Sequence, residues 1–349
     1  MSIDPYASVA LGRTGVRVTR LGLGGASIGG LYRPVPEDTA VAVVGHAWDL
    51  GIRYFDVAPL YGYGSAERRM GMALAGRPRG EFALSTKVGR VLVPRGAIPP
   101  GADVDRQSLD GQDDAFYAGT PPVRPVFDYS RDGVRRSLEA SLERLGLERI
   151  DIAYIHDPDD HWATAIGEAY PALARLREEG TVGAIGAGMN QAGMLARFAR
   201  EGDFDAFLVA GRYTLLDQAA LPELLPLCLA NGIAVVIGGV MNSGLLADPR
   251  PGATFNYVPA DAARVARAER IRSMCERHGV PLKAAAVQFP FAHPAVASLV
   301  AGVRSIEHLD EYPELMRRPI PAGLWSELKS EGLLAADAPT PGPSAAASG

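Results

Sequence analysis

Four ionisable residues in the first half of the chain stand at, or just after, the ends of strand-like runs. Asp56, Lys87 and His156 each end such a run, and Tyr61 follows Asp56 by five positions. Parallel strands with helices between them deliver their carboxyl ends to one face, so residues far apart in sequence meet there. Taken singly, each has an ordinary structural explanation, such as a helix cap or a core histidine. Their joint placement predicts one active site.

The four side chains suit proton transfer to or from an oxygen atom. A free phenol has a pKa of about 10, so Tyr61 needs a cation beside it to act near neutrality. A lysine ammonium about 4 Å away supplies roughly 4 kcal/mol in favour of the phenolate, whereas lowering the pKa by two units requires only about 2.7 kcal/mol. We expect Lys87 to supply this charge, and Asp56 to hold Lys87 charged and in place.

His156 completes the predicted site, because its ring can donate a hydrogen bond to a substrate oxygen beside the phenol. Such a set favours proton transfer coupled to hydride transfer over hydrolysis, since no activated nucleophile is evident. A metal-dependent hydrolase or isomerase that uses Asp56 and Glu67 is a rival, but no His-rich ligand set accompanies these carboxylates. Asp157 and Asp159 either contact substrate hydroxyls or cap the next helix.

Strand-like and helix-like segments alternate along the chain. Eight strand-like runs follow one another at residues 20–24, 52–56, 82–86, 150–155, 182–187, 206–209, 233–237 and 296–300. Between them apolar residues recur at helical spacing, as over residues 134–145 and 262–278. Alternation of this kind requires a parallel sheet, and eight repeats favour closure into a (β/α)8 TIM barrel of the α/β class.

Two segments depart from the regular repeat. Residues 9–18 carry two short alternating runs around a glycine-containing turn, which predicts an N-terminal β-hairpin that plugs one end of the barrel. Residues 91–129 form a long Pro-, Gly- and Asp-rich loop after the third strand, with Phe116 and Tyr117 inside it. This loop is far longer than an ordinary strand-to-helix connection and emerges on the face of the predicted site, so it is a candidate lid.

A doubly wound dinucleotide fold is the competing architecture, because residues 22–29 place glycines directly after a strand. Their spacing is Gly-x-Gly-x-x-Ser, and no acidic residue ends a strand about 20 residues later, so the fingerprint fails. We therefore expect residues 1–337 to form a single barrel domain. Residues 338–349 contain hardly any large apolar group and are predicted to be a disordered tail.

The composition indicates a small-molecule substrate. The formal net charge of -5 gives no basic footprint for nucleic acid or an anionic membrane, and 47% hydrophobic residues suffice for a large core. Cys228 and Cys275 lack metal-ligand spacing and fit inert buried thiols in a reducing cytoplasm. No secretory signal is evident, and glycines and asparagines interrupt the uncharged stretch 224–247, which excludes a membrane span. The oligomeric state has no readable signature.

The same residues resemble the aldo-keto reductases, over roughly residues 9–328. The Asp-Tyr-Lys-His tetrad of that family matches Asp56, Tyr61, Lys87 and His156 in Phe-Asp-Val-Ala-Pro-Leu-Tyr-Gly, Ser-Thr-Lys-Val and Tyr-Ile-His-Asp-Pro-Asp. The resemblance implies an oxidoreductase that acts on CH–OH groups, with the tyrosine as general acid and base. It also implies a nicotinamide dinucleotide extended over the barrel mouth, so the failed glycine fingerprint is no objection.

The resemblance places cofactor contacts in three segments. Asn190 should reach the nicotinamide carboxamide, and residues 239–245 should wrap the pyrophosphate with backbone N–H groups. The implied cofactor-binding residues are Asn190, Gly239, Asn242, Gly244, Leu245, Gly302, Arg304, His308 and Glu311. Many relatives hold the nicotinamide with a glutamine and a tyrosine, where this chain has Ala210 and Gly238. The nicotinamide packing therefore departs from the family pattern, with Tyr213 a nearby substitute.

Residues 302–311 imply NAD in preference to NADP. NADP-dependent relatives carry a lysine and an arginine in this segment, and the arginine pairs with the 2′-phosphate. This chain has Gly302 and His308 there, with Arg304 as the nearby cation. A neutral histidine binds a phosphate much more weakly than an arginine does, because the guanidinium is charged and donates two parallel hydrogen bonds.

Three further segments, Leu-Tyr-Gly-Tyr-Gly-Ser-Ala-Glu, Val-Phe-Asp-Tyr-Ser-Arg-Asp and Gly-Arg-Tyr-Thr-Leu-Leu-Asp-Gln, resemble the sugar-oxidising branch of the family. That branch implies oxidation of the anomeric hydroxyl of an aldose, of the L-fucose or D-threo-aldose type, to a lactone. Similar chains oxidise pyridoxal, another cyclic hemiacetal, at its 4-position. General aldehyde or ketone reduction and a non-catalytic, cofactor-sensing subunit are the remaining alternatives.

Overall fold

The computed structural model describes residues 2–105 and 117–342. Within these residues, eight parallel strands pair in chain order and close into a barrel. They are β3 (Leu21–Gly24), β4 (Tyr54–Asp56), β5 (Ala83–Val88), β8 (Ile150–His156), β9 (Val182–Met189), β10 (Ala206–Ala210), β11 (Ala234–Gly238) and β14 (Val296–Gly302). The predicted (β/α)8 TIM barrel is confirmed, and each strand ends within two residues of its predicted limits.

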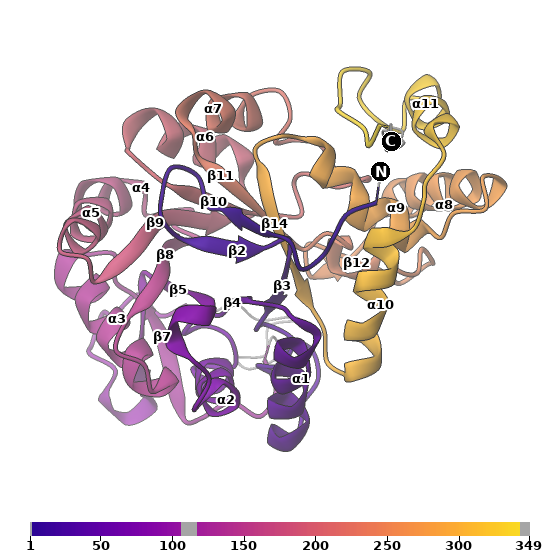
Figure 1. The fold of residues 1–349 in the computed structure, drawn as a ribbon. Helices are drawn as coiled ribbons and strands as arrows, with labels where there is room; N and C mark the ends of the chain where they lie inside the picture. The colour runs from indigo at the N-terminus through magenta and orange to yellow at the C-terminus, as the bar shows by residue number, and fades with distance from the viewer. Residues whose placement is uncertain (1, 106–116, 343–349) are drawn as a thin grey trace.

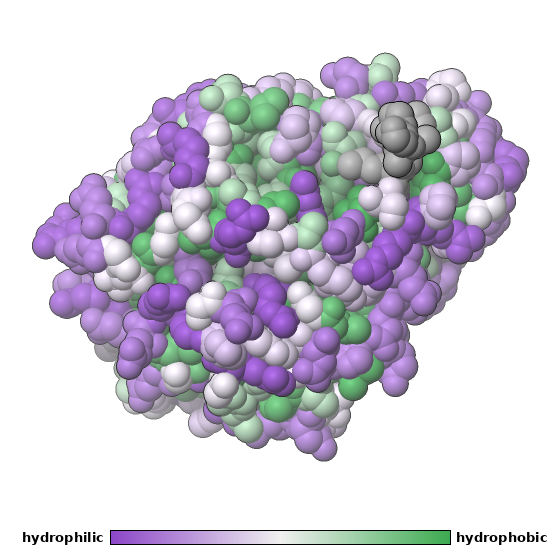
Figure 2. All heavy atoms as spheres, in the orientation of Figure 1, coloured by the Kyte–Doolittle hydropathy of each residue, from purple (hydrophilic) through white to green (hydrophobic). Residues whose placement is uncertain are grey.

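Helices surround the barrel on its outer side (Figure 1). In the described parts of the chain they are α1 (Glu37–Leu50), α2 (Ser65–Leu74), α3 (Arg131–Leu145), α4 (Trp162–Thr164), α5 (Tyr170–Glu178), α6 (Ala192–Glu201), α7 (Leu224–Asn231), α8 (Ala262–Arg277), α9 (Leu282–Gln288), α10 (Ile306–Arg317) and α11 (Ala322–Ser330). Figure 2 shows hydrophilic residues over most of the outer rim, where these helices meet water.

Strand residues alternate between two apolar cores. Outward-facing side chains such as Phe55 and Leu84 pack against the helices, whereas Ile152 and Val236 belong to a separate core inside the barrel. Because both faces of a parallel sheet are covered in this way, the strands read as nearly continuous apolar runs.

Helix α3 illustrates how local sequence sets the limits of an element. The Ser130 side chain accepts a hydrogen bond from the Gly133 backbone N–H, and Gly146 ends the helix in a left-handed conformation. Val134 and Leu138 lie on its buried face. The helix predicted over residues 134–145 is therefore confirmed, and its first turn begins earlier because Ser130 supplies the cap.

The N-terminal hairpin closes one end of the barrel. Its strands β1 (Ser8–Ala10) and β2 (Arg17–Thr19) pair antiparallel, with Val9 opposite Val18. Leu11 and Val18 are buried in the same core as the inward-facing barrel side chains. Figure 1 shows β2 lying across the barrel opening, so the predicted plug is confirmed.

The long loop after the third barrel strand contains a two-stranded sheet. Strands β6 (Arg90–Pro94) and β7 (Val123–Phe127) pair antiparallel, and Val104 bridges to Val126. Tyr117 is buried, with its ring 6.3 Å from that of Tyr61. Phe116 lies outside the described residues. The candidate lid is thus anchored at the predicted active site by its own hairpin.

The C-terminal end of the described chain turns back onto the outer core. Ala338, the first residue of the predicted tail, is buried there. Residues 343–349 lie outside the described residues, so the disordered tail and the domain boundary stay predictions. In residues 2–105 and 117–342 no helix is long and apolar enough to cross a membrane. Burial raises the pKa of the free thiols of Cys228 and Cys275 to about 12, as expected for inert cysteines.

Two tyrosines occupy the barrel interior because glycines on neighbouring strands leave room for them. A Cβ atom added at Gly22 would lie 2.7 Å from the Tyr54 ring. One added at Gly186 would lie 2.7 Å from the Tyr154 ring and 1.9 Å from the Ala206 carbonyl oxygen. These separations are far below a van der Waals contact, so both positions require glycine.

We predict that Gly186→Ala destabilises the barrel by about 3 kcal/mol or more, because the methyl group meets a strand carbonyl that cannot move without breaking the ladder. Gly193→Ala is the matched control, since no atom lies within 4 Å of an added Cβ at that helical position. Urea unfolding monitored by circular dichroism measures both. Equal stability of the two variants would contradict the proposed packing.

Candidate active site

Asp56 and Lys87 form a buried ion pair at the carboxyl ends of β4 and β5. Their side chains are 3% and 1% exposed. Lys87 Nζ donates to the two carboxylate oxygens of Asp56 at 2.9 and 2.8 Å, and to the Val57 carbonyl oxygen at 2.9 Å. Because all three ammonium hydrogens have acceptors, the pair offsets much of the cost of removing its charges from water.

Tyr61 and His156 lie against this pair. Lys87 Nζ is 4.6 Å from the centroid of the Tyr61 ring. The imidazole of His156 stands edge-on to the phenol, with 5.7 Å between ring centroids and 87° between ring planes. The structure therefore brings the four predicted residues together at one end of the barrel.

The pKa of the Tyr61 phenol differs from our expectation. Burial, reinforced by the negative charge of Asp56, raises it well above its usual value. Lys87 lies close to the phenol, but its ammonium is already bonded to the Asp56 carboxylate. Little net positive charge remains to favour the phenolate, so at neutral pH Tyr61 is a protonated phenol that can donate to a carbonyl oxygen.

His156 is a neutral hydrogen-bonding group. Burial, together with the positive charges of Arg90 and Lys87, lowers its pKa well below the usual value. Its backbone carbonyl accepts hydrogen bonds from the Arg90 guanidinium at 2.8 Å and from the Tyr129 hydroxyl at 2.6 Å. These two bonds fix the end of β8 and hence the position of the imidazole.

Arg90 is a site residue that the sequence analysis missed. Its side chain is 2% exposed and pairs with Asp105 at 2.5 Å, with the guanidinium 4.7 Å from the Phe127 ring centroid. The one sequence feature that could have identified Arg90 as a site residue is its position three residues after Lys87. Gly89, with a φ of 105°, turns the chain there and directs Arg90 back toward the site.

Asp157 and Asp159 line the site and do not cap the next helix, which begins after His161. Asp157 has a left-handed φ of 41°, a conformation that costs a non-glycine residue about 1–3 kcal/mol and is common at functional sites. Its carboxylate lies 3.4 Å from the His156 ring and 3.9 Å from Arg90. Burial raises the pKa of Asp157 to about 6, despite the nearby guanidinium.

Two adjoining cavities meet at the phenol. The first, called here the tetrad cavity, has a volume of about 510 Å³ and is lined by Tyr61, Lys87, Arg90, His156, Asp157 and Asn190, among others. The second, called the glycine-rich cavity, has a volume of about 390 Å³ and is lined by several backbone glycines and by residues of the segment 302–311. The residues common to both are Tyr61, Leu208, Ala210 and Tyr257.

Most of the residues implied as cofactor contacts line these cavities. Those on the glycine-rich cavity are Gly239, Gly244, Gly302, Arg304, His308 and Glu311. Asn190 lines the tetrad cavity. The Asn242 side chain instead bonds to the Thr214 hydroxyl at 2.7 Å and the Gly211 carbonyl oxygen at 3.1 Å. Leu245 is buried in the outer core, so these last two side chains line neither cavity.

The positions that depart from the family pattern lie on the wall of the glycine-rich cavity. Ala210 and Gly238 are paired neighbours on β10 and β11, and both line the glycine-rich cavity. Tyr213 is not a substitute for the missing aromatic ring. It is buried 5.0 Å from the Phe289 ring centroid and lines neither cavity. Tyr257, from the hairpin of β12 (Thr254–Phe255) and β13 (Val258–Pro259), reaches both cavities instead.

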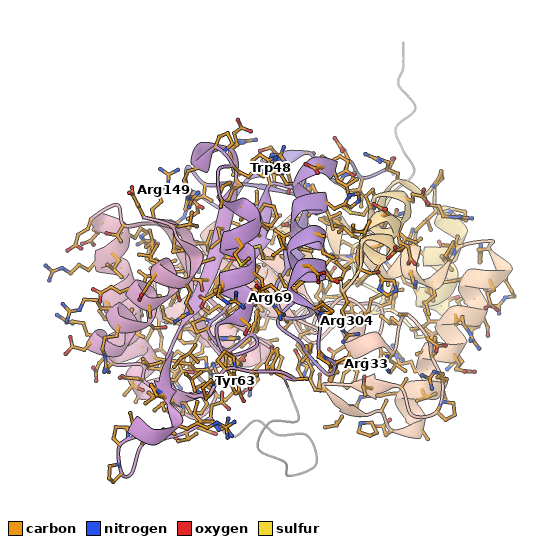
Figure 3. All side chains as sticks on the ribbon, turned by 90° about the horizontal axis from the view of Figure 1, so that it is seen from below. Arg33, Trp48, Tyr63, Arg69, Arg149 and Arg304 are labelled. Carbon is orange, nitrogen blue, oxygen red and sulfur yellow. The ribbon has the colours of Figure 1, made fainter. Side chains whose placement is uncertain are left out.

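The far end of the glycine-rich cavity carries positive charge. Arg304 donates to the Leu31 carbonyl oxygen at 2.8 Å, and its buried Nε has no hydrogen-bond partner in the described chain. Figure 3 shows Arg33 beside it near the barrel mouth. Lys283, which the sequence analysis missed because it lies in an earlier helix, pairs with Glu311 at 2.7 Å. An unsatisfied buried donor and a glycine-lined wall fit an elongated anionic ligand such as a dinucleotide.

Glu67 does not join Asp56, so the pair of carboxylates on which the metal-dependent alternative depends is not formed. Its fully buried carboxylate accepts a hydrogen bond from Thr86 at 2.8 Å and pairs with Arg144 at 2.6 Å, on the helix side of β5. Over the described ranges, no group of three or more His, Cys, Asp or Glu side chains could hold a metal ion. Glu67 therefore has a structural role.

The sequence profile of the Aldo/keto reductase family matches residues 20–330. The chain belongs to this family. This aldo/keto reductase is 43% identical over 339 residues to the pyridoxal 4-dehydrogenase of Microbacterium luteolum, covering 93% of this chain and 97% of that protein. It is 42% identical over 344 residues to the D-threo-aldose 1-dehydrogenase of a Pseudomonas species, covering 97% and 99%.

The fold of this aldo/keto reductase is similar to that of a solved family member from Bacillus halodurans in its holo form. The TM-score is 0.72 at 23% sequence identity, with 95% of this chain and 97% of that chain covered. The family and the two dehydrogenase relatives make the chain an oxidoreductase that acts on CH–OH groups with a nicotinamide cofactor.

We predict that Lys87→Met destabilises the fold by about 3–5 kcal/mol, because it leaves the Asp56 carboxylate buried without its counter-ion. The double variant Asp56→Asn/Lys87→Met removes both charges and should recover most of that loss while remaining inactive. Thermal or urea unfolding measures the stability of each. If the double variant were as unstable as the single one, charge pairing would not be the reason for the loss.

Proposed function

We propose that this aldo/keto reductase is an NAD-dependent dehydrogenase that oxidises the anomeric hydroxyl of an aldose, of the L-fucose or D-threo-aldose type, to a lactone. The observation that carries the proposal is the tetrad cavity, which is lined by Tyr61 and His156 together with several carboxylates. The 42% identity to a D-threo-aldose 1-dehydrogenase supports the same substrate class.

In this mechanism Tyr61 is the general base and His156 the orienting donor. A nicotinamide cofactor bound in the glycine-rich cavity supplies the acceptor for the hydride that leaves the anomeric carbon. Tyr61, as phenolate, takes the proton of the anomeric hydroxyl, while neutral His156 donates a hydrogen bond to the same oxygen. Because burial raises the pKa of Tyr61, the phenolate fraction and the oxidation rate rise with pH. Carbonyl reduction uses the phenol and is favoured at lower pH.

The lining of the tetrad cavity suits a ligand with several hydroxyls. Asp157, Asp159 and Asp160 line it together with His161. Carboxylates accept hydrogen bonds from neighbouring hydroxyls, and Asp157, with a pKa of about 6, is ionised at neutral pH. Tyr117 adds an apolar face against which the C–H groups of a sugar ring can pack.

Pyridoxal is the second candidate substrate. The 43% identity to a pyridoxal 4-dehydrogenase favours it, and so do the aromatic side chains of Tyr61, Tyr117 and Phe127 in the lining of the tetrad cavity. A flat heteroaromatic ring stacks on such side chains. Since pyridoxal also closes to a cyclic hemiacetal, the acid–base chemistry is unchanged and only the fit to the cavity differs.

Initial rates of NADH formation with L-fucose and, in parallel, with pyridoxal test the proposal. We expect turnover of L-fucose and related aldoses, and loss of about 10³-fold in kcat for Tyr61→Phe, with NAD binding unchanged, because the phenol acts only in proton transfer. Tyr213→Phe, at a buried tyrosine outside both cavities, is the control. Turnover of pyridoxal alone would move the assignment to the second candidate, and loss of NAD binding in Tyr61→Phe would contradict its role.

We further propose that NAD is preferred over NADP because of Glu311. Its carboxylate lines the end of the glycine-rich cavity that the family resemblance assigns to the adenosine ribose, and there it neutralises Lys283. A carboxylate repels a 2′-phosphate but accepts a hydrogen bond from a free ribose hydroxyl. The guanidinium of Arg304 is partly occupied by the Leu31 carbonyl oxygen.

Glu311→Gln should raise the ratio of kcat/KM for NADP to that for NAD by about tenfold, because it removes the repelling charge and frees the Lys283 ammonium for the phosphate. Glu314→Gln changes an exposed carboxylate on the same helix outside the cavity and should leave the ratio unchanged. A wild-type protein that turned over NADP better than NAD would overturn the proposal.

A further inference from the structure

A line of hydroxyl groups inside the barrel ends on the Asp56 carboxylate. The Tyr154 hydroxyl lies 3.4 Å from the Tyr54 hydroxyl, which lies 3.2 Å from Ser85 Oγ. Ser85 Oγ in turn lies 2.7 Å from Oδ1 of Asp56. The three hydroxyl residues are fully buried.

The direction of the hydrogen bonds in this hydroxyl line follows from its end. An ionised carboxylate only accepts, so the hydrogen of Ser85 must point at Asp56. The oxygen of Ser85 then accepts from Tyr54, and that of Tyr54 accepts from Tyr154. Every hydrogen in the line therefore points toward the carboxylate, an arrangement in which each bond polarises and strengthens the next.

The interior of the barrel is shaped to hold the hydroxyl line. The tyrosines of the line belong to the inner core together with apolar side chains such as Ile152 and Val236. The two tyrosine rings fit because Gly22 and Gly186 stand beside them. Burial, reinforced by the charge of Asp56, also raises the pKa of Tyr54, so this residue keeps its hydrogen and remains a donor.

We propose that Ser85, supported by Tyr54 and Tyr154, is a positioning residue for the reaction. Oδ1 of Asp56 accepts from both Ser85 and Lys87. The serine bond takes up part of the negative charge and fixes the carboxylate plane, which leaves more of the ammonium charge for the Tyr61 phenolate. Without it, a less screened carboxylate would hold the ammonium more tightly and repel the phenolate.

The inference rests on the proposed roles of Tyr61 and Lys87 but not on the identity of the substrate. The test therefore measures kcat and KM against pH in two reactions, oxidation of L-fucose with NAD and reduction of 4-nitrobenzaldehyde with NADH. Failure to oxidise L-fucose would count against the proposed function alone, since the aldehyde reaction still reports on Ser85.

For oxidation of L-fucose, Ser85→Ala should lower kcat about tenfold at pH 8 with KM changed less than about twofold, the factor expected when a hydrogen bond worth about 1.4 kcal/mol is lost at the Asp56 carboxylate. For reduction of 4-nitrobenzaldehyde, which uses the protonated phenol, the effect should appear as a displaced pH limb. The pH limb that reports the phenol should move to higher pH. Ser85→Thr keeps the hydroxyl and should restore both. Tyr54→Phe should shift the limb in the same direction by a smaller amount, and it keeps the test valid if Ser85→Ala does not fold.

Two matched controls remove a buried hydroxyl outside the line. Ser298 is buried on β14 and donates to the Thr19 and Arg20 carbonyl oxygens, and Tyr213 is buried outside both cavities. Ser298→Ala and Tyr213→Phe should leave the pH limb in place. The inference is overturned if Ser85→Ala and Tyr54→Phe behave like these controls, or if Ser85→Thr is as impaired as Ser85→Ala.

Discussion

The site depends on keeping one ion pair charged inside a barrel that excludes water. Burying an ammonium and a carboxylate is costly unless each is fully hydrogen-bonded. Lys87 meets that condition with three acceptors, and Asp56 meets it with the ammonium and the Ser85 hydroxyl. In the parallel register of β4 and β5, Asp56 pairs with Ser85, so Lys87, two residues further on, lies at the same end of the barrel. Tyr61 and His156 then obtain their electrostatic properties from the pair and from their burial.

The parts of the fold that follow from local pattern could be predicted from the sequence. Strand runs, the hairpin plug and helix α3 follow from alternation, turn residues and a serine cap, all of which act over a few residues. The four tetrad residues could be grouped because each ends a strand or follows one closely, and parallel strands have their carboxyl ends at one face. The grouping of the tetrad thus follows from the parallel strand topology, which the alternation of strand-like and helix-like segments in the sequence predicts.

The features of the site that the sequence did not predict depend on contacts between segments far apart in the chain. Arg90 is buried with Asp105, in the long loop, as its counter-ion. Lys283 lines the glycine-rich cavity and pairs there with Glu311. No local pattern specifies either partner. The pKa of Tyr61 could not be predicted for a related reason. The direction of the pKa shift depends on whether the Lys87 ammonium is free or already bonded to Asp56. The distances between these side chains decide this, and the sequence does not give them.

The glycines beside the interior tyrosines have a consequence for how such a barrel can change. Gly22 leaves the space that Tyr54 fills, and Tyr54 carries a hydroxyl of the line that ends on Asp56. A larger residue at Gly22 fits only if a smaller residue replaces Tyr54, and that replacement removes the hydroxyl. Substitutions at these two positions are therefore coupled, and repacking the interior of this barrel by design changes its proton chemistry at the same time.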